Sequence, residues 1–135
     1  MRKSLLLVLD DSKVVCGLIQ SMIEEKLQHD CVCFGSLEEV PKDVLAKVDL
    51  VILDYYFGTI AESENNNGVK YMMSLKRINP KISIIVFSGQ KKDSLAIKMI
   101  SMGAEYYIDK NSDNFIELLI KAVSNVIEFK KSVYK

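Results

Sequence analysis

The stretch LLLVLDD, residues 5–11, decides the fold, because five consecutive apolar residues run directly into two aspartates. An apolar run of this length is typical of a strand buried on both faces, as in a parallel sheet covered by helices. Four further apolar runs follow along the chain, at residues 31–34, 50–53, 82–87 and 106–108. The five runs predict five strands.

Segments with apolar residues at every third or fourth position separate these strands, which predicts amphipathic helices. They comprise residues 14–27, a stretch after Ser36, 71–78, 95–100 and 115–127. Ser36 and Glu39 form a candidate capping box for the second helix, which Pro41 bends or restarts. Ser112 is a candidate N-cap for the last. Strands that alternate with helices in this way predict an open, doubly wound α/β sheet with helices on both faces.

Size and charge limit the class of protein. The chain has 135 residues, 49% of them hydrophobic, so we expect one globular domain over residues 1–135. Eighteen basic and eighteen acidic side chains cancel, so no direct binding to nucleic acid or to a membrane is expected. The apolar run at residues 5–9 is too short for a signal sequence or for the ~20 residues that span a bilayer. These features predict a cytoplasmic protein.

The three cysteines are predicted to be free, buried thiols. Cys31 and Cys33 are two residues apart on an expected strand and so point to one face, while Cys16 lies on an expected helix. A zinc site would need further ligands, and the only histidine is His29. We assign His29 no catalytic role.

Polar residues close four of the five predicted strands. They are Asp10 and Asp11, then Asp54, then Ser88 and Gly89, and finally Asp109 and Lys110. In an open α/β sheet, ligands bind at the carboxyl ends of the strands, near the point where the strand order reverses. Folding is therefore expected to gather these side chains at one edge.

The chemistry of this edge favours a divalent cation and a phosphate. Asp10, Asp11 and Asp54 would repel one another, and a hard cation such as Mg²⁺ relieves that repulsion with oxygen ligands. Mg²⁺ commonly keeps one position for a phosphate oxygen. Lys110 can pair with a second phosphoryl oxygen, and the Ser88 hydroxyl can donate a hydrogen bond to a third.

In this order, the strand-end residues and the segment GAEYYIDK, residues 103–110, resemble the receiver domains of response regulators. The resemblance covers residues 3–126. It implies a flavodoxin-like sheet of five parallel strands in the order 2-1-3-4-5, with helices on both faces.

The resemblance also implies roles for the acidic residues. Asp54 is the phosphoacceptor. Asp11 and Asp54 bind Mg²⁺ or Mn²⁺ directly, Tyr56 adds its backbone carbonyl, and Asp10 acts mostly through water. Such a protein promotes its own phosphorylation and dephosphorylation, and it is not an enzyme with a separate substrate.

Ser88, Lys110 and Tyr107 match the remaining family positions. The resemblance implies that Ser88 and Lys110 contact the phosphoryl group during transfer, and that Ser88 and Tyr107 form the switch. Phosphorylation is expected to draw the hydroxyl toward the phosphoryl group, and the ring is expected to fill the vacated space. The surface that changes is built from the fourth helix, the fifth strand and the fifth helix.

The implied partners are proteins of a signalling pathway. A histidine kinase or a histidine phosphotransfer protein supplies the phosphoryl group. A downstream protein target or a linked output domain reads the switched surface, and a weak homodimer through the same surface is a further option.

Two features depart from the family pattern. The loop at residues 57–67 is longer than usual, and it is either a tolerated insertion or a lid over the site. Asn111 follows Lys110 where the family commonly has a proline after a cis bond. A cis bond before a residue other than proline costs about 2.5–4 kcal/mol, so we expect a trans bond here.

Two other functions compete with phosphoacceptance. A pseudo-receiver would act as an interaction module without phosphorylation, but such modules commonly lack one of the site residues that this chain retains. A small α/β phosphohydrolase would need a second aspartate soon after Asp54, and Tyr55, Tyr56 and Phe57 supply none.

Overall fold

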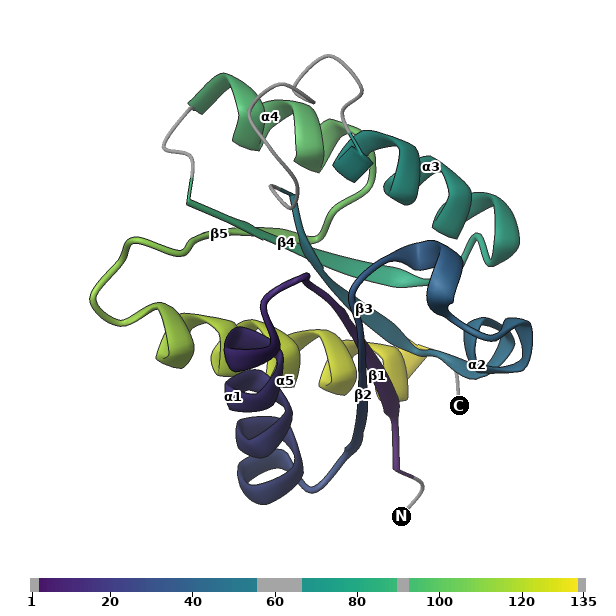
Figure 1. Cartoon of the computed structure of the whole chain (residues 1–135), viewed down its shortest axis with the longest axis horizontal. Coiled ribbons are helices and arrows are strands. Elements are labelled where there is room, and N and C mark those ends of the chain that lie inside the picture. The colour runs from purple at the N-terminus through teal and green to yellow at the C-terminus, as the bar shows by residue number, and fades with distance from the viewer. Residues whose placement is uncertain (1–2, 56–66, 90–92, 134–135) are drawn as a thin grey trace.

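The sheet has the predicted topology. In the computed structural model, which describes residues 3–55, 67–89 and 93–133, five parallel strands lie in the order β2-β1-β3-β4-β5 (Figure 1). They are β1 (Leu5–Leu9), β2 (Asp30–Phe34), β3 (Leu50–Asp54), β4 (Ser83–Ser88) and β5 (Tyr106–Asp109). The prediction of a doubly wound sheet is thus confirmed, with strand bounds within about a residue of the apolar runs.

Helices cover both faces of the sheet (Figure 1). They are α1 (Lys13–Met22), α2 (Lys42–Lys47), α3 (Asn67–Ile78), α4 (Asp93–Ser101) and α5 (Phe115–Val133). Helix α1 continues as a π-helical turn at Ile23–Leu27, and Gln28, with a φ of 58°, ends it in the left-handed conformation. No helix among the described residues is both long enough and apolar enough to cross a membrane.

The sheet separates two hydrophobic cores. Along β1, Leu6 and Val8 point toward α1 and α5, whereas Leu7 and Leu9 point toward α2, α3 and α4. This alternation is the pleat of a strand, and it explains why the run at residues 5–9 is apolar throughout. Both faces of β1 and β3 are therefore buried.

Two local predictions need correction. Ser36 forms no cap bond to the backbone, and its hydroxyl instead contacts the Glu39 carboxylate at 3.1 Å, because residues 37–39 form a single 3-10 turn. Pro41 does restart the helix, as predicted. Helix α5 begins at Phe115, three residues after Ser112, because Phe115 N–H closes a turn on the Ser112 carbonyl.

Some apolar residues of the helical pattern face outward. Val14 and Leu18 on α1 are 81% and 47% exposed, and Ile97 on α4 is 69% exposed. The core face of α1 is narrower than its composition suggests. It is carried by Cys16 and Ile19, and Ile23 continues it in the π-helical turn.

A lysine of α5 ties together the segments at the end of the sheet opposite the strand carboxyl ends. Nζ of Lys130, on α5, donates to the backbone carbonyls of Asp49 and Lys81 at 2.9 Å each, and to Oγ of Ser83 at 3.2 Å. Burial lowers the pKa of Lys130 from its usual value. These bonds fix the C-terminal part of α5 across the sheet.

Candidate functional site

Three aspartates meet at the carboxyl ends of β1 and β3. Leu9 and Leu53 are partners in the parallel ladder, so the residues that follow them, Asp10 and Asp54, stand side by side. Carboxylate oxygens of Asp10, Asp11 and Asp54 all lie within 4.8 Å of one another. Asp10 and Asp54 are each only 2% exposed, whereas Asp11 faces solvent.

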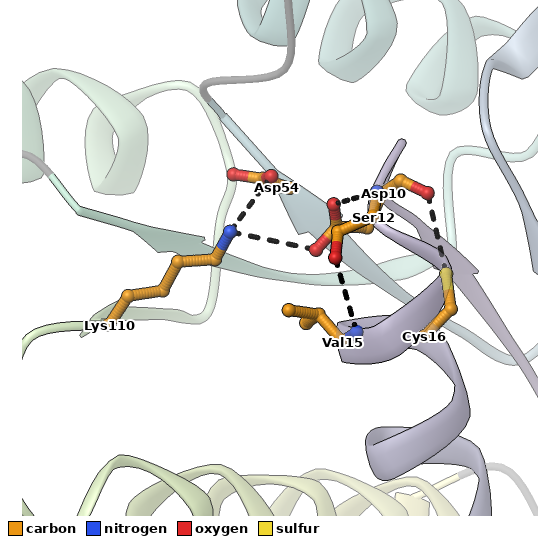
Figure 2. Close-up of polar contacts among 6 residues, drawn as sticks. All are labelled: Asp10, Ser12, Val15, Cys16, Asp54 and Lys110. Carbon is orange, nitrogen blue, oxygen red and sulfur yellow. Dashed lines mark hydrogen bonds and ion pairs between the residues drawn. The ribbon is translucent and has the colours of Figure 1, made fainter.

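The start of α1 fixes the conformation of Asp10. Ser12 N–H donates to Oδ1 of Asp10 at 2.9 Å, and the Ser12 hydroxyl accepts from Val15 N–H at 3.3 Å as the N-cap of the helix (Figure 2). The Cys16 thiol donates to the Asp10 carbonyl at 3.4 Å. Asp10 is thus held through both its side chain and its main chain.

Lys110 reaches this acidic pair from the end of β5. Its Nζ lies 2.9 Å from Oδ2 of Asp54 and 3.5 Å from Oδ2 of Asp10 (Figure 2). The ammonium also lies 4.6 Å from the centre of the Phe87 ring, which stacks on Phe115 with the ring centres 6.1 Å apart. The face of the Phe87 ring therefore stabilises the lysine ammonium by a cation–π contact.

The buried carboxylate of Asp10 is only partly compensated by its neighbours. Burial raises the pKa of Asp10 to about 6; the Ser12 N–H opposes this effect and the neighbouring Asp54 charge adds to it. Among the described residues, Oδ2 of Asp10 is a buried side-chain oxygen without a hydrogen bond. A buried carboxylate in this state favours a proton or a cation.

The donor set fits a hard divalent cation. The site offers clustered carboxylates, one of them solvent-facing, and an oxygen that lacks a hydrogen bond. Mg²⁺ prefers such oxygen ligands. Asp10, Asp11 and Asp54 are the residues that would hold the ion; the predicted backbone ligand Tyr56 lies outside the described residues.

Ser88 and Tyr107 are in contact. Ser88 ends β4 and is fully buried, and it follows Phe87, the ladder partner of Asp54. Burial raises the pKa of Tyr107, while a hydrogen bond with the Ser88 side chain opposes that rise. The two residues predicted to form a switch are therefore directly linked.

The structure brings Asp10, Asp11, Asp54 and Lys110 together, and it links Ser88 to Tyr107. It also adds three residues that the sequence did not single out for the site: Ser12, Phe87 and Cys16. A serine before a helix is a recognisable N-cap signal, but nothing in the sequence marks Phe87 as the support of a lysine. Residues 57–66 of the long loop lie outside the described residues, and Asn67 already belongs to α3.

Comparison with known protein families identifies the family of this chain. The family model of the response regulator receiver domain matches residues 6–123. The chain belongs to this family. It is thus a receiver domain of two-component signalling, a family that binds Mg²⁺ through acidic residues and interacts with histidine kinases or phosphotransfer proteins.

Individual relatives agree with the family. A putative response regulator NtrX-like protein of Rickettsia typhi is 28% identical over 127 residues, which cover 93% of this chain and 26% of the relative. The corresponding protein of Rickettsia bellii is 24% identical over the same length. This receiver domain therefore spans about a quarter of the length of the curated relatives that it matches.

Solved structures share the fold. A response regulator receiver domain protein from Clostridium thermocellum has a TM-score of 0.78 at 22% identity, covering 96% of this chain and 98% of its own. A response regulator from Thermotoga maritima has a TM-score of 0.75 at 21% identity, covering 94% and 99%. At these identities the likeness is one of fold.

Proposed function

We propose that this receiver domain accepts a phosphoryl group on Asp54 from a phosphohistidine of a histidine kinase or histidine phosphotransfer protein, with Mg²⁺ or Mn²⁺ bound. The observation that carries the proposal is the position of Asp54. Its carboxylate is buried at a strand end, 2.9 Å from the Lys110 ammonium and beside two further carboxylates. An aspartate with a purely structural role would not require an ammonium group and two further carboxylates beside it.

The transfer forms one bond and breaks another. An Asp54 carboxylate oxygen attacks phosphorus as the bond between phosphorus and the histidine nitrogen breaks, and the imidazole leaves with that electron pair. Lys110 pairs with the charge on the phosphoryl oxygens, and the Ser88 hydroxyl donates to another of them. The divalent cation, when bound, neutralises the carboxylates and the incoming negative charge.

The protein would be its own substrate. The same carboxylates and Lys110 that assist phosphorylation would also assist hydrolysis of the aspartyl phosphate, so we propose a self-acting phosphoacceptor and not an enzyme with a separate substrate. The phosphorylated state would then persist for a time set by this site and its donor.

Phosphorylation would change the surface of α4, β5 and α5. The hydrogen bond between Ser88 and Tyr107 links the site to this surface, and Tyr107 packs against the same core as Met99 of α4. Movement of Ser88 toward the phosphoryl group would release the ring. A groove between β5 and α5, lined in part by Tyr106, Tyr107 and Leu118, would change with it, and a protein target, a linked output domain or a second copy would read the change.

The test is the mass of the intact protein after incubation with acetyl phosphate and Mg²⁺. The native chain should gain the mass of one phosphoryl group, and Asp54→Asn should gain none. Asp43→Asn, on the exposed side of α2, serves as the matched control and should be phosphorylated. A native chain that gains no mass, even with excess Mg²⁺ and a set of histidine phosphotransfer donors, would instead favour the pseudo-receiver.

A further inference from the structure

The turn after β5 is joined to the end of β4 by a side chain. Nδ2 of Asn111 donates to the Gly89 carbonyl at 2.6 Å, and Asn111 N–H donates to Oδ1 of Asp109 at 2.8 Å. A Cβ atom placed on Gly89 would lie 3.8 Å from the same Nδ2. The Asn111 side chain therefore lies along Gly89, across 22 residues of sequence.

This bond extends the ladder between the two strands. Ser88 and Asp109 are the last ladder partners of β4 and β5, and Lys110 N–H then donates to the Ser88 carbonyl at 2.9 Å. The Asn111 side chain binds the next carbonyl, that of Gly89. Consecutive carbonyls of one strand end are thus held by consecutive residues of the other.

Both Asn111 bonds need a donor that proline does not have. Proline carries no N–H and no side-chain amide, so it could make neither the bond to Asp109 nor the bond to Gly89. The described residues contain no cis peptide bond, as expected for Lys110–Asn111. Asn111 consequently fixes the turn with two hydrogen bonds, which a proline at this position could not form.

We propose that Asn111 is a positioning residue for phosphoryl transfer, which it serves by anchoring Lys110 and the Ser88–Gly89 peptide to each other. The inference rests on the proposed function. The Lys110 backbone is fixed by its own bond to Ser88 and by the Asn111 bonds that follow, and its ammonium then meets Asp54 at 2.9 Å. If the Asn111 hydrogen bonds are lost, the Lys110 ammonium and the Ser88 hydroxyl occupy a wider range of positions. Small displacements of groups that contact the phosphoryl oxygens slow transfer.

The first test compares rates of phosphorylation by acetyl phosphate in saturating Mg²⁺. Asn111→Ala should be about two- to tenfold slower than the native chain, which is the range expected for loss of one neutral hydrogen bond. Its affinity for Mg²⁺ should not change, because Asn111 contacts none of the three aspartates. Asn79→Ala is the matched control: it removes a side-chain bond from another exposed turn, to Lys81 N–H, and should keep the native rate.

An isosteric variant separates the hydrogen bond from the shape. Asn111→Asp keeps the size of the side chain but loses the Nδ2 donor and faces the Gly89 carbonyl with a like partial charge, so it should be at least as slow as Asn111→Ala. Asn114→Asp places the same charge three residues further on and should keep the native rate. An Asn111→Asp protein as fast as the native chain would overturn the proposal.

Hydrogen exchange of the Lys110 amide tests the anchor itself. In Asn111→Ala this amide should exchange about two- to tenfold faster, while amides of β1 and β3 stay unchanged. A slower phosphorylation without faster exchange, or faster exchange at a native rate of phosphorylation, would overturn the positioning role. A native chain that takes no phosphoryl group would instead remove the proposed function, whereas a phosphorylated native chain with an unchanged Asn111→Ala variant would remove this inference alone.

Discussion

Oδ2 of Asp10 and Nζ of Lys110 lie 3.5 Å apart, and that carboxylate oxygen accepts no hydrogen bond among the described residues. The closer partner of Lys110 is Asp54, at 2.9 Å. One ammonium is thus shared by two buried carboxylates and favours one of them. Asp10 is left as the less compensated charge, which makes it the residue whose removal is most informative.

Replacing Asp10 should weaken Mg²⁺ binding. Asp10→Asn keeps the shape of the side chain but removes a charge beside the ion, and we expect the affinity to fall about 10- to 100-fold, as for residues that act on a metal through its outer shell. Calorimetric titration measures this. Asp43→Asn, on the exposed side of α2, is the control and should bind Mg²⁺ as the native chain does.

The metal-free protein should lose stability as the pH rises. Asp10 keeps its proton up to about pH 6 in the folded state, whereas its ordinary pKa is 3.8, so unfolding releases a proton between these values. The free energy of unfolding therefore falls across this window, by at most about 3 kcal/mol for a shift of roughly two units. Urea unfolding without metal measures the free energy of unfolding of the native chain and of Asp10→Asn at pH 4 and pH 7. The stability of the variant relative to the native chain should be higher at pH 7 than at pH 4. A difference that does not vary with pH would contradict this account.

Lys110→Met should slow phosphorylation by acetyl phosphate about 10- to 100-fold, because a hydrogen bond between charged groups is lost in the transition state. Methionine is unbranched like lysine, and Phe87 keeps its stacking on Phe115, so the core should persist. Lys47→Met, on the exposed end of α2, should keep the native rate. Equal rates in the two variants would mean that Lys110 does not meet the phosphoryl group.

Lys130→Met should reduce the free energy of unfolding by about 1–3 kcal/mol, because it leaves the Asp49 and Lys81 carbonyls without this donor. Lys121→Met, at an exposed position of the same helix, should change stability by less than about 0.5 kcal/mol. Phosphorylation should be unaffected in both, since Lys130 lies at the other end of the sheet. Urea denaturation and the mass assay together check this.

The thiols should react slowly in the folded protein. A hydrogen bond with Cys33, together with burial, raises the pKa of Cys16. The Cys16 contact alone would lower the pKa of Cys33, but the contact with Cys31 and burial outweigh it and raise that pKa to about 12. At pH 8 we expect reaction with an aromatic disulfide reagent at least about 100-fold slower than for a free thiol. All three cysteines should react at once in denaturant. Fast modification of Cys16 or Cys31 in the native chain would contradict their burial; Cys33 is only partly buried.

The sheet could be predicted because its signal is local. Apolar runs such as LLLVL and the aspartates that end them are consecutive in the sequence, and the strand-end rule for α/β sheets then places Asp10 beside Asp54. The outward faces of α1 were harder, since Val14 and Leu18 follow a helical period as well as the core residues do. The period of apolar residues predicts the helix, but it does not show which of two apolar faces packs against the core.

Contacts between distant turns were out of reach. The bond from Asn111 to Gly89 depends on how two turns are placed after β4 and β5, and the sequence showed Asn111 only as a residue where a proline is common. The support of Lys110 by Phe87 is similar, because a phenylalanine inside an apolar strand looks like any other core residue. The chemistry of the site was therefore predictable, and the means of holding it in place was not.

The sheet that separates the two cores also makes the packing of the two helical layers largely independent. Leu6 and Val8 pack with one helical layer, and Leu7 and Leu9 pack with the other, so a substitution in either layer needs compensation mainly on its own side. The aspartates and Lys110 sit at the rim shared by both layers. A substitution in the helices on one side is thus expected to leave the packing of the other side, and the phosphoryl chemistry proposed for the rim, largely unchanged.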